Sequence, residues 1–466
     1  MPSPRVLCAG LLSVILLASV PAAIPADKEK AGKPPAADPV SYYKQIRPIL
    51  QAQCQGCHQP AKAQGGYVMT DFARLLAAGD SGKTAVVPGK PADSELIRQV
   101  TTKDGKAAMP KKDKPLHASD VELLARWIAQ GAKDDTPANA RVHFDEAHPP
   151  IYTQPPVITG LDYSPDGKLL AVAGFHEVLL TDPVEGKLVG RLIGLSERIQ
   201  GVKFSPDGKR LAVAGGNPGR LGELQVWDVA RKKLLLSKVV GFDTLYGASW
   251  SPDGNLLAVG CPDNNVRAFD AATGEQKVQQ GAHSDWALDT VFSKDGSHLI
   301  SVGRDMTAKL TEMATGRFID NITSITPGAL KGGIQTVDRH PDRDEIVTGG
   351  SDGTPKVYRI YRQTARQIGD DANLIQKLPA MTGRVFSVAV SHDGFRIAAG
   401  SALDNKGQVF IYPYPVPRDA KITNRIKAIE SKREKQRTRA EKAELERLRT
   451  ALGTDVVRHE VPTGCV

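Results

Sequence analysis

The sequence predicts a multidomain protein in which a small all-α domain precedes an all-β propeller and a charged helix. Three observations support this organisation: apolar residues at helical spacing in the first third, a four-residue turn that recurs through the centre, and a dense run of Lys, Arg and Glu near the end. With 466 residues the chain can bury more than one hydrophobic core. We therefore expect two or three domains.

The first 26 residues have the pattern of a secretory signal peptide. Arg5 is followed by an apolar run from Val6 to Val20 and then by small residues up to Ala26. This run is shorter than a bilayer span requires, and a retained membrane anchor is the alternative. No later stretch is long and apolar enough to cross a membrane. We expect an exported, periplasmic or cell-envelope protein in which residues 27–39 form a linker rich in Lys, Ala and Pro.

Residues 40–133 are predicted to form the small helical domain. Apolar residues recur at helical spacing from Tyr42 to Leu50, and Pro48 must either kink this helix or begin a new one. A second helix is predicted from Ser119, because Glu122 follows three residues later as in a capping box, and Gly131 is its predicted end. The Pro-containing segment 134–156 is predicted to be a linker.

A repeated turn predicts a propeller over residues 157–416. Ser-Pro-Asp-Gly occurs at 164–167, 205–208 and 251–254, and degraded copies occur at 293–296, 340–343 and 391–394. Each copy lies between short strand-like segments, and a spacing of roughly forty to fifty residues is typical of propeller blades. One small sheet cannot bury both of its faces alone, whereas a closed ring buries each blade against its neighbours. Six repeats are visible, and the presence of a seventh blade stays open.

Residues 417–466 are predicted to form a charged helix and a strand-like tail. Twelve Lys or Arg and six Asp or Glu lie between Arg418 and Thr450, so much of the formal net charge of +9 is concentrated there. Such local basicity argues against nucleic acid as a partner of an exported protein. We expect a solvated helix over 421–452, packed at both ends; a coiled coil is the alternative, although residues 430–439 interrupt the apolar stripe. The tail 456–466 either completes a blade or ends inside one.

The strongest chemical signal is Cys54-Gln55-Gly56-Cys57-His58. Two thiols three residues apart can reach the two vinyl groups on one edge of a haem, and His58 is then held beneath the iron as the proximal ligand. A redox pair, a disulfide and part of a zinc site are the alternatives. A zinc site lacks a second Cys pair here, and a redox pair lacks its usual βαβ context. We therefore expect one haem c attached at Cys54 and Cys57.

Three residues are candidates for the second axial ligand of the iron. Met109 precedes Pro110 in a Lys-rich loop, and the proline favours an extended conformation that can present a thioether. Met69 lies before an apolar run and is more simply interpreted as a core residue, and His117 is the third candidate. We expect Met109 to be the distal ligand, which implies six-coordinate, low-spin iron suited to electron transfer.

Both regions resemble known families. The first is similar to the planctomycete-type cytochrome c domain in the order of Ile49-Leu50, the Cys54–His58 motif, Gly65-Gly66, Gly89-Lys90-Pro91, Met109-Pro110 and Trp127-Ile128. The resemblance implies haem c held by Cys54, Cys57 and His58 with Met109 as axial ligand, and Lys111 stands where these domains often have a second proline. The repeats resemble WD-repeat propellers, with the Trp-Asp pair itself at residues 227–228, and fusion of the two resembles a common architecture of that group.

The repeats contain few candidate functional side chains. Those that could face a central funnel are His176-Glu177, His283 with Asp285 and Trp286, and His340. Each is more simply a packing or turn residue. Cys261 follows a strand and is expected to be a buried, inert thiol.

Three functional hypotheses follow from these patterns. The first is an exported, non-enzymatic electron carrier whose propeller docks a redox partner protein or another envelope protein. The second is an oxidoreductase in which the propeller or an open haem iron acts on a small substrate, although the single haem motif argues against peroxidase chemistry. The third is an envelope scaffold in which haem is structural or absent. Low-spin, six-coordinate iron would favour the first.

Overall fold

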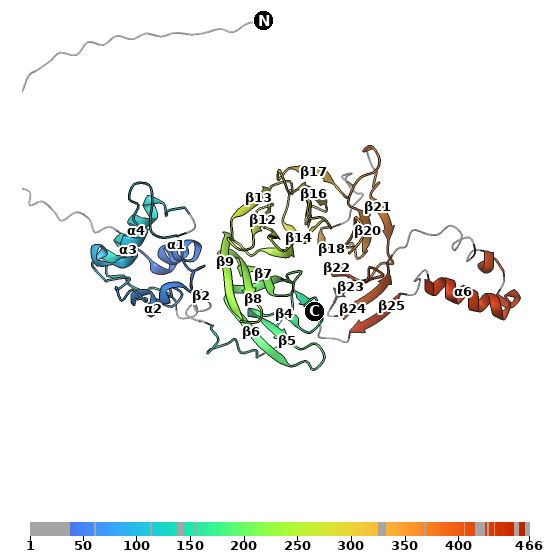
Figure 1. The fold of residues 1–466 in the computed structure, drawn as a ribbon, viewed down its shortest axis with the longest axis horizontal. Helices are drawn as coiled ribbons and strands as arrows, with labels where there is room; N and C mark the ends of the chain where they lie inside the picture. Colours follow the sequence, from blue (N-terminus) through green and yellow to red (C-terminus); the bar gives the residue numbers. More distant parts are fainter. Residues whose placement is uncertain are drawn as a thin grey trace, which may run out of the picture. The chain divides into compact units, whose positions relative to one another are not determined.

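The computed structural model describes residues 38–59, 62–111, 114–137, 144–153, 156–324, 332–367, 370–404, 406–414, 425, 428–432, 434–451 and 456–461. The predicted signal peptide and most of the linker after it lie outside the described residues. Within the described part of the chain, no helix is long and apolar enough to cross a membrane. A small helical region is followed by many antiparallel strands (Figure 1), which confirms the predicted fold class.

The helical region is assembled from short helices joined by tight turns. Its elements are a π-helix (Tyr42–Ile46), α1 (Arg47–Gln53), β1 (His58–Gln59), β2 (Lys62–Ala63), a 3-10 helix (Gln64–Gly66), α2 (Phe72–Leu76), a second 3-10 helix (Pro91–Asp93), α3 (Glu95–Val100) and α4 (Ala118–Ala129). Pro48 lies in the first turn of α1, where its missing N–H costs nothing. Of the two predicted roles of Pro48, the structure therefore has the second, the start of a new helix.

Aromatic packing holds the helical region together. The ring of Tyr42 stacks on Trp127 with centroids 5.5 Å apart, and Phe72 meets Tyr42 edge to face at 4.8 Å. Ile46, Leu50 and Leu124 are fully buried in the same core. This core joins α1 to α4 and so fixes the segment that follows α1.

The predicted start of α4 was wrong. The helix begins at Ala118, its N-cap is His117, and no side chain caps it. Ser119 therefore lies inside the first turn, and its Oγ is 3.3 Å from His117 Nδ1. The predicted end was correct, because Gly131 follows the helix with a φ of +97°, a conformation that glycine adopts without strain.

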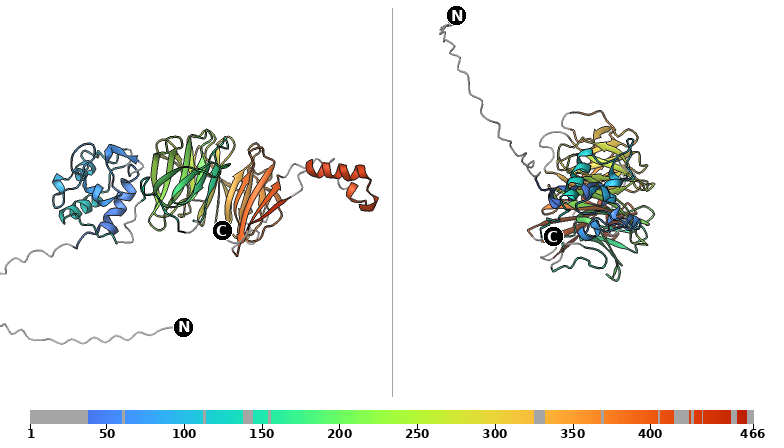
Figure 2. Two further views of the ribbon diagram at one scale, coloured as in Figure 1. Left: turned by 90° about the horizontal axis from the view of Figure 1, so that it is seen from below. Right: turned by 90° about the vertical axis from the view of Figure 1, so that its left-hand side faces the viewer.

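Six four-stranded antiparallel blades make up the rest of the described sheet structure (Figure 1; Figure 2). β6 ends the first blade and begins the second, because its first part pairs with β5 and its last part with β7. The strands of the first two blades are β3 (Leu161–Tyr163), β4 (Leu170–Ala173), β5 (Phe175–Thr181), β6 (Leu188–Phe204), β7 (Arg210–Asn217), β8 (Leu221–Asp228) and β9 (Lys233–Gly241). Those of the third and fourth are β10 (Tyr246–Trp250), β11 (Leu256–Gly260), β12 (Val266–Asp270), β13 (Gln276–Gln280), β14 (Ala287–Phe292), β15 (His298–Gly303), β16 (Ala308–Glu312) and β17 (Phe318–Asn321). The last two blades hold β18 (Ile334–Arg339), β19 (Glu345–Gly350), β20 (Lys356–Arg359), β21 (Leu374–Lys377), β22 (Arg384–Val390), β23 (Arg396–Leu403), β24 (Lys406–Pro413) and β25 (Val457–Val461).

Aspartates on inner strands join neighbouring blades. Asp162 accepts a hydrogen bond from the backbone N–H of Phe204 in the next blade, at 2.8 Å. Asp289 accepts in the same way from Val337 at 3.0 Å, and Asp338 accepts from the N–H of residue 390 at 2.7 Å. Apolar clusters that span adjacent blades lie behind these bonds, as the propeller prediction required.

The recurring turn is a self-contained hydrogen-bonded unit. In the third copy, Ser251 Oγ donates to Asp253 Oδ1 at 2.5 Å and accepts from the N–H of Leu256 at 2.8 Å. Gly254 has a φ of +69°, which is why the fourth position is glycine. The hydrogen bond from Ser251 lowers the pKa of the Asp253 carboxyl. The Ser-Pro-Asp-Gly motif therefore indicates a loop of fixed geometry and not a reactive site.

The tail completes the last blade. Residues 457–461 form β25, which pairs with β24 from Gly407↔Val461 to Ile411↔Val457. Of the two predicted roles of the tail, this is the first. No seventh blade is present among the described residues, and apolar side chains on the two end blades are exposed, including Leu161 (58%) and Tyr163 (54%) on the first and Val457 (48%) on the last.

The charged segment is not one helix, so the prediction of a continuous helix over 421–452 was wrong. Residues 428–430 and α6 (Arg439–Ala451) are helical, and a 3-10 helix (Glu434–Gln436) lies between them. Thr438 Oγ1 accepts from the N–H of Glu441 at 3.1 Å and Glu441 Oε2 accepts from the N–H of Thr438 at 3.0 Å, a capping box that begins a new helix. The ion pair of Arg425 with Glu444, at 2.8 Å, joins the two pieces.

Candidate functional site

The Cys54–His58 motif forms one extra helical turn after α1. Cys54 is the C-cap of that helix, and its carbonyl accepts hydrogen bonds from the N–H groups of Cys57 and His58, both at 3.1 Å. Both thiols are free and half-buried. Burial, and next the neighbouring Cys57, raise the pKa of the Cys54 thiol to about 12. The two thiols are thus presented on a single turn, with the imidazole directly after them.

The imidazole of His58 is held with one nitrogen available to a metal. Nδ1 lies 3.3 Å from the carbonyl oxygen of Tyr67. Because a carbonyl can only accept, this contact places the ring proton on Nδ1 and leaves the lone pair on Nε2. Burial lowers the pKa of His58, against the opposing effect of the carbonyls of Tyr67 and Gln64. The side chain is therefore a neutral imidazole, the form that binds iron.

A buried amide network supports this turn, and sequence reasoning missed it. Gln55 and Gln59 are 4% and 1% exposed, although neither carries an obvious role in the motif. Gln55 Nε2 donates to the carbonyl of Met69 at 2.9 Å, Gln59 Nε2 donates to the carbonyl of Gln55 at 3.0 Å, and the N–H of Met69 donates to the carbonyl of His58 at 2.9 Å. Both the carbonyl and the N–H of Met69 are thus hydrogen-bonded to the motif, and these bonds hold the segment that carries Tyr67 next to it. No signal in the sequence distinguishes these glutamines from solvated ones.

The three candidates for the distal ligand differ in their surroundings. Met69 is 4% exposed within the hydrophobic core. His117 is exposed at the start of α4, where its Nδ1 contacts Ser119. Met109 is half-buried against the same core, and its N–H donates to the carbonyl of Gln99 at 2.9 Å, which anchors the loop to α3. The Met109 side chain is thus partly exposed, while its backbone is anchored to α3.

The residues present fit a haem. Two thiols lie on one turn, an imidazole has a free Nε2, and several apolar side chains around the core are only partly covered: Ile49, Tyr67, Ile97 and Met109. A flat apolar group needs this combination of covalent anchors, an axial nitrogen and apolar walls. Within the described ranges no group of three or more His, Cys, Asp or Glu side chains could hold a metal ion by itself.

In the propeller, His283 lies between an aspartate and a serine. Its Nδ1 is 3.0 Å from Asp305 Oδ2 and its Nε2 is 2.8 Å from Ser301 Oγ, which is the order of a nucleophilic triad. All three groups are buried, with Ser301 2% exposed, so no substrate can reach the hydroxyl. The arrangement ties the loop before β14 to β15 and serves the fold.

The other propeller candidates are also engaged in the structure. His340 Nδ1 accepts from the N–H groups of Asp342 and Arg343, both at 3.0 Å, in the fifth copy of the recurring turn. Glu177 is fully buried, pairs with Arg191 at 2.6 Å and accepts a hydrogen bond from the Tyr152 hydroxyl at 2.9 Å. Cys261 is 2% exposed, and burial raises its pKa to about 11.

Three family models match parts of the chain. "Planctomycete cytochrome C" matches residues 54–113, from the first motif cysteine past Met109. "Anaphase-promoting complex subunit 4 WD40 domain" matches residues 219–289, and "WD domain, G-beta repeat" matches residues 274–311. The two resemblances seen in the sequence are therefore confirmed.

Curated relatives match the repeats over short stretches. The chain is 34% identical over 94 residues to mouse WD repeat and SOCS box-containing protein 1, covering 20% of this chain and 22% of that protein. It is 30% identical over 165 residues to nuclear distribution protein PAC1 of Coccidioides posadasii, covering 32% and 35%. It is 30% identical over 154 residues to mouse coronin-7, covering 31% and 16%. The chain thus spans about a third or less of the length of these relatives.

Proposed function

Because the chain joins a cytochrome c domain to WD repeats, we propose that it is an exported electron carrier with a single haem c and that its propeller docks a partner protein. The observation that carries the proposal is the Cys54–His58 turn, where two free thiols precede a neutral imidazole with its Nε2 unprotonated. The family of the first domain binds haem c and favours a location outside the cytoplasm.

Each residue of the site has a distinct task. Cys54 and Cys57 would attach a haem covalently as thioethers, and His58 Nε2 and Met109 would ligate its iron. When bound, the haem supplies reversible uptake and release of one electron. The carbonyl of Tyr67 fixes the imidazole plane through Nδ1, and the buried amide of Gln55 keeps the Tyr67 segment in place through Met69.

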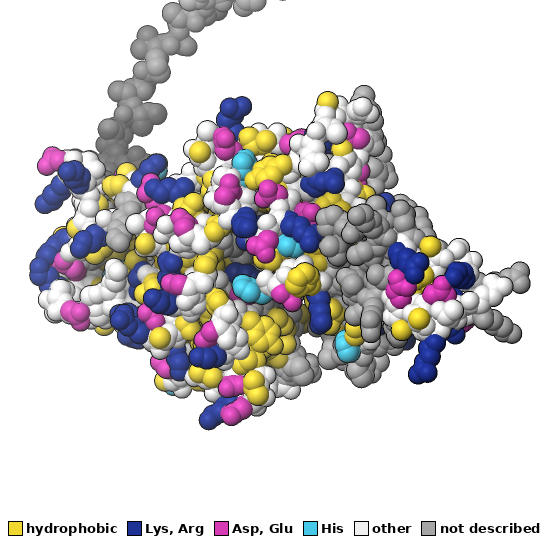
Figure 3. Space-filling model, turned by 45° about the vertical axis from the view of Figure 1, so that its right-hand side comes forward, with side chains coloured by type: hydrophobic (Ala, Val, Ile, Leu, Met, Phe, Trp, Pro, Cys, Tyr) yellow, Lys and Arg dark blue, Asp and Glu magenta, His cyan; other side chains and the backbone are white. Residues whose placement is uncertain are grey.

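The propeller supports a docking role. WD-repeat propellers generally mediate protein–protein interactions, and the blades of this chain hold no accessible triad or metal cluster among the described residues. On the face drawn in Figure 3, basic and acidic side chains are interspersed without a broad field of one sign. Such a surface favours a protein partner over nucleic acid.

The decisive test is the absorption spectrum of the full chain expressed with export and c-type haem maturation, recorded oxidised and reduced. Covalently bound haem with a low-spin spectrum is expected. Cys54→Ala with Cys57→Ala should abolish covalent haem, while Cys261→Ala, a matched thiol removal in the propeller, should leave it unchanged. No covalent haem in the parent chain, beside a control cytochrome that matures in the same cells, would sink the proposal and leave the envelope scaffold.

A second arm of the same experiment tests the distal ligand. Met109→Ala is expected to convert the spectrum to high-spin, because the iron loses a strong-field thioether. A spectrum that stays low-spin would transfer the role to Met69 or His117. The corresponding Met69→Ala and His117→Ala spectra then identify which.

A further inference from the structure

The first and last blades each have one face that no neighbouring blade covers. In the four blades between them, the second strand is buried along both of its faces, as the strands β7, β11, β15 and β19 show. In β4 of the first blade and β23 of the last, fully buried residues alternate with more exposed ones. Because successive residues of a strand point to opposite faces, each end blade is covered on one side only.

The uncovered face of the first blade is bulky and apolar. Leu161 and Tyr163 on its inner strand are 58% and 54% exposed. Val202 and Phe204 stand at the same distance before the recurring turn in the second blade, where the first blade covers them, and they are 6% and 4% exposed. Residues paired along the sheet extend the uncovered face: Val172, Leu170 and Leu179. Positions that are buried at the first junction are thus open at the start of the ring.

The uncovered face of the last blade has small side chains on its inner strands. Ala389 of β22 is exposed and lies opposite Ala398 of β23, which in turn lies opposite Ile411 of β24. Ser387 and Gly400 are paired in the same way and lie on the same face. This face is therefore apolar and flat near the centre of the ring.

A small face against a bulky face is also how the internal junctions are built. At the first junction, Ala171 and Ala173 pack in one cluster with Phe204 and Trp227 of the next blade. The second and third junctions repeat this with other residues: Ala212 and Ala214 with Trp250, and Ala258 and Ala268 with Phe292. An element that precedes the first blade should therefore turn small side chains toward it. An element that follows the last blade should turn bulky side chains toward that blade.

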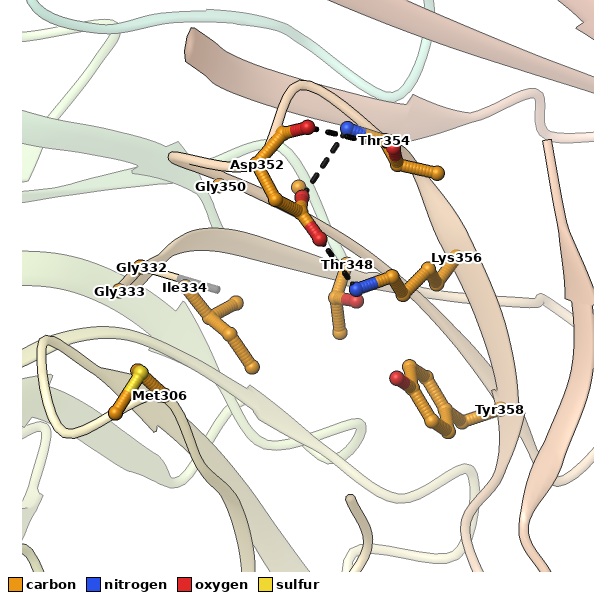
Figure 4. Close-up of a pocket in the computed structure, with 11 residues that line it drawn as sticks. Met306, Gly332, Gly333, Ile334, Thr348, Gly350, Asp352, Thr354, Lys356 and Tyr358 are labelled. Carbon is orange, nitrogen blue, oxygen red and sulfur yellow. Dashed lines mark hydrogen bonds and ion pairs between the residues drawn. The ribbon is translucent and has the colours of Figure 1, made fainter. Parts of the chain in front are cut away.

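A closed junction leaves no comparable space. The pocket between the fourth and fifth blades has room for about one water molecule. Figure 4 shows the side chains that line it, among them Met306, Ile334 and the ion pair of Asp352 with Lys356. This internal junction does not admit a protein segment, whereas the two uncovered faces present whole sheet surfaces.

The first and last blades are neighbours around the ring (Figure 1; Figure 2), but they are not joined as the other blades are. Asp162 and Asp338 each accept a hydrogen bond from a backbone N–H of the next blade. The last blade has Ala389 at this position, two residues before the recurring turn, and alanine has no side-chain acceptor. The last blade is also completed by its own strand β25 and not by a strand of the first. A further element can therefore enter between these two blades.

We propose that the uncovered faces of the first and last blades, here termed the end faces, together bind a β-sheet element donated by a partner protein, which serves as a seventh blade. The element carries small apolar side chains on the face toward the first blade and bulky apolar side chains on the face toward the last. Burial of both end faces drives its binding and removes an exposed apolar patch. This inference rests on the proposed docking role of the propeller and not on haem attachment.

The first measurement asks whether the end faces are open in the full chain. Leu161→Cys should react with N-ethylmaleimide roughly tenfold faster, or more, than Thr290→Cys, because a buried thiol is inert. Thr290 is the matched control, since it stands at the equivalent position of the fourth blade and is 3% exposed. Mass spectrometry of the digested protein identifies the labelled residue. Protection of Leu161→Cys that is lost on dilution would show that a second copy of the chain covers the face, and this would overturn the proposal.

The second measurement asks whether the ring closes on itself. Dibromobimane, a short thiol crosslinker, should not join the two positions of Tyr163→Cys/Ala389→Cys within one chain. Asp338→Cys/Val390→Cys is the positive control, because these residues hold the equivalent positions at the junction of the fifth and sixth blades. Efficient crosslinking of the first pair would show that the end faces cover each other, which would also overturn the proposal.

The third measurement tests binding with a β-hairpin of the predicted chemistry. Residues 256–270 of this chain form β11, β12 and the turn between them. In the third blade this hairpin has Leu257 and Phe269 on one face and Ala258 and Ala268 on the other. The probe is a synthetic peptide of these residues with a serine in place of its cysteine, cyclised to hold the hairpin and labelled with fluorescein. Fluorescence anisotropy should show that it binds the full chain.

Variants of the end faces locate the bound peptide. Tyr163→Lys and Ala389→Lys change exposed residues, one on each end face, and should each weaken binding roughly tenfold or more. Ile319→Lys is the control, because this apolar residue is exposed on the outer strand of the fourth blade, and it should bind the peptide as the parent does. A peptide with Leu257→Thr and Phe269→Thr lacks the bulky face and should also bind roughly tenfold more weakly.

Two results of this binding experiment would overturn the proposal. One is a parent chain that does not bind the hairpin, and the other is binding that neither Tyr163→Lys nor Ala389→Lys weakens. Cys54→Ala/Cys57→Ala should bind the peptide as the parent does. Loss of haem without loss of peptide binding, or the reverse, separates failure of the electron-carrier proposal from failure of this one.

Discussion

Two short motifs stand out in this chain, and the structure gives them opposite roles. Cys54–His58 occurs once, and its thiols and imidazole Nε2 remain available after the backbone bonds are made. Ser-Pro-Asp-Gly recurs from blade to blade, and in the copy at 251–254 the side chains satisfy one another. The motif that occurs once and keeps free reactive atoms indicates a functional site in the helical region. The repeated motif, which keeps none, indicates a structural role in the propeller.

The largest change in stability is expected in the helical region, where Met69 is assigned to the hydrophobic core and Met109 to the iron. Met69→Ala removes a buried core side chain and should destabilise the region by about 2–5 kcal/mol, measured by denaturant unfolding. Met109→Ala removes a half-exposed one and should cost less than about 1 kcal/mol while changing the iron spectrum. The reverse pattern, with Met69 controlling the spectrum and Met109 the stability, would show that the two residues have been assigned the wrong way round.

An intermediate effect is expected for the repeated turn. Ser251→Ala leaves the N–H of Leu256 without its side-chain acceptor and removes one of the donors to the Asp253 carboxylate, and it should cost about 1–2 kcal/mol of propeller stability. Ser284→Ala is the control, because that serine is exposed. Thermal unfolding of both variants checks the difference. Equal melting temperatures would contradict the structural role given to the motif.

The smallest expected effect concerns Glu223, a fully buried carboxyl in the propeller. It accepts hydrogen bonds from Ser196 and Gln225, both at 2.7 Å, and from Ser237. Burial raises its pKa above the ordinary 4.5, so the folded state holds the proton more tightly than the unfolded chain does. Its contribution to stability is therefore fully present below pH 4.5 and is lost as the pH rises through the folded-state pKa.

Glu223→Gln removes this titration with a change in stability below about 1 kcal/mol, because the shape is conserved. The difference in unfolding free energy between parent and variant should shift in favour of the variant as the pH rises from 4 to 8. Taking this difference cancels the turn aspartates, whose lowered pKa values act in the opposite direction. A difference that stays constant with pH would contradict the raised pKa of Glu223.

Features formed by residues close together in the sequence could be predicted, whereas features formed by distant residues could not. Cys54, Cys57 and His58 are contiguous, and the recurring turn fits in four residues, so both are read directly. The Ser119–Glu122 pattern misled because the same spacing also occurs inside a helix, while the real capping box at Thr438 lay within a segment predicted as continuous helix. The spacing of Ser and Glu alone does not distinguish the N-cap of a helix from a position inside its first turn.

The parts that could not be predicted are assembled from distant residues. The hydrogen bonds that join neighbouring blades, such as the one from Phe204 to Asp162, connect residues far apart in the sequence, and only the blade topology brings these residues together. The support for His58 depends on a backbone carbonyl at Tyr67, which has no residue-type signature at all. Triad-like His283 shows the converse, since its burial, which only the structure reveals, removes it from chemistry.

The pairing of β25 with β24 also affects the order in which the propeller can be completed during synthesis. Residues 457–461 follow the 414–456 segment in the chain, so during synthesis the last blade first has an open edge at β24. Until the closing strand arrives, that edge is a template for pairing with other chains. Products interrupted inside the charged segment would keep this edge permanently open, so the pairing of β25 is a late step that completes the last blade.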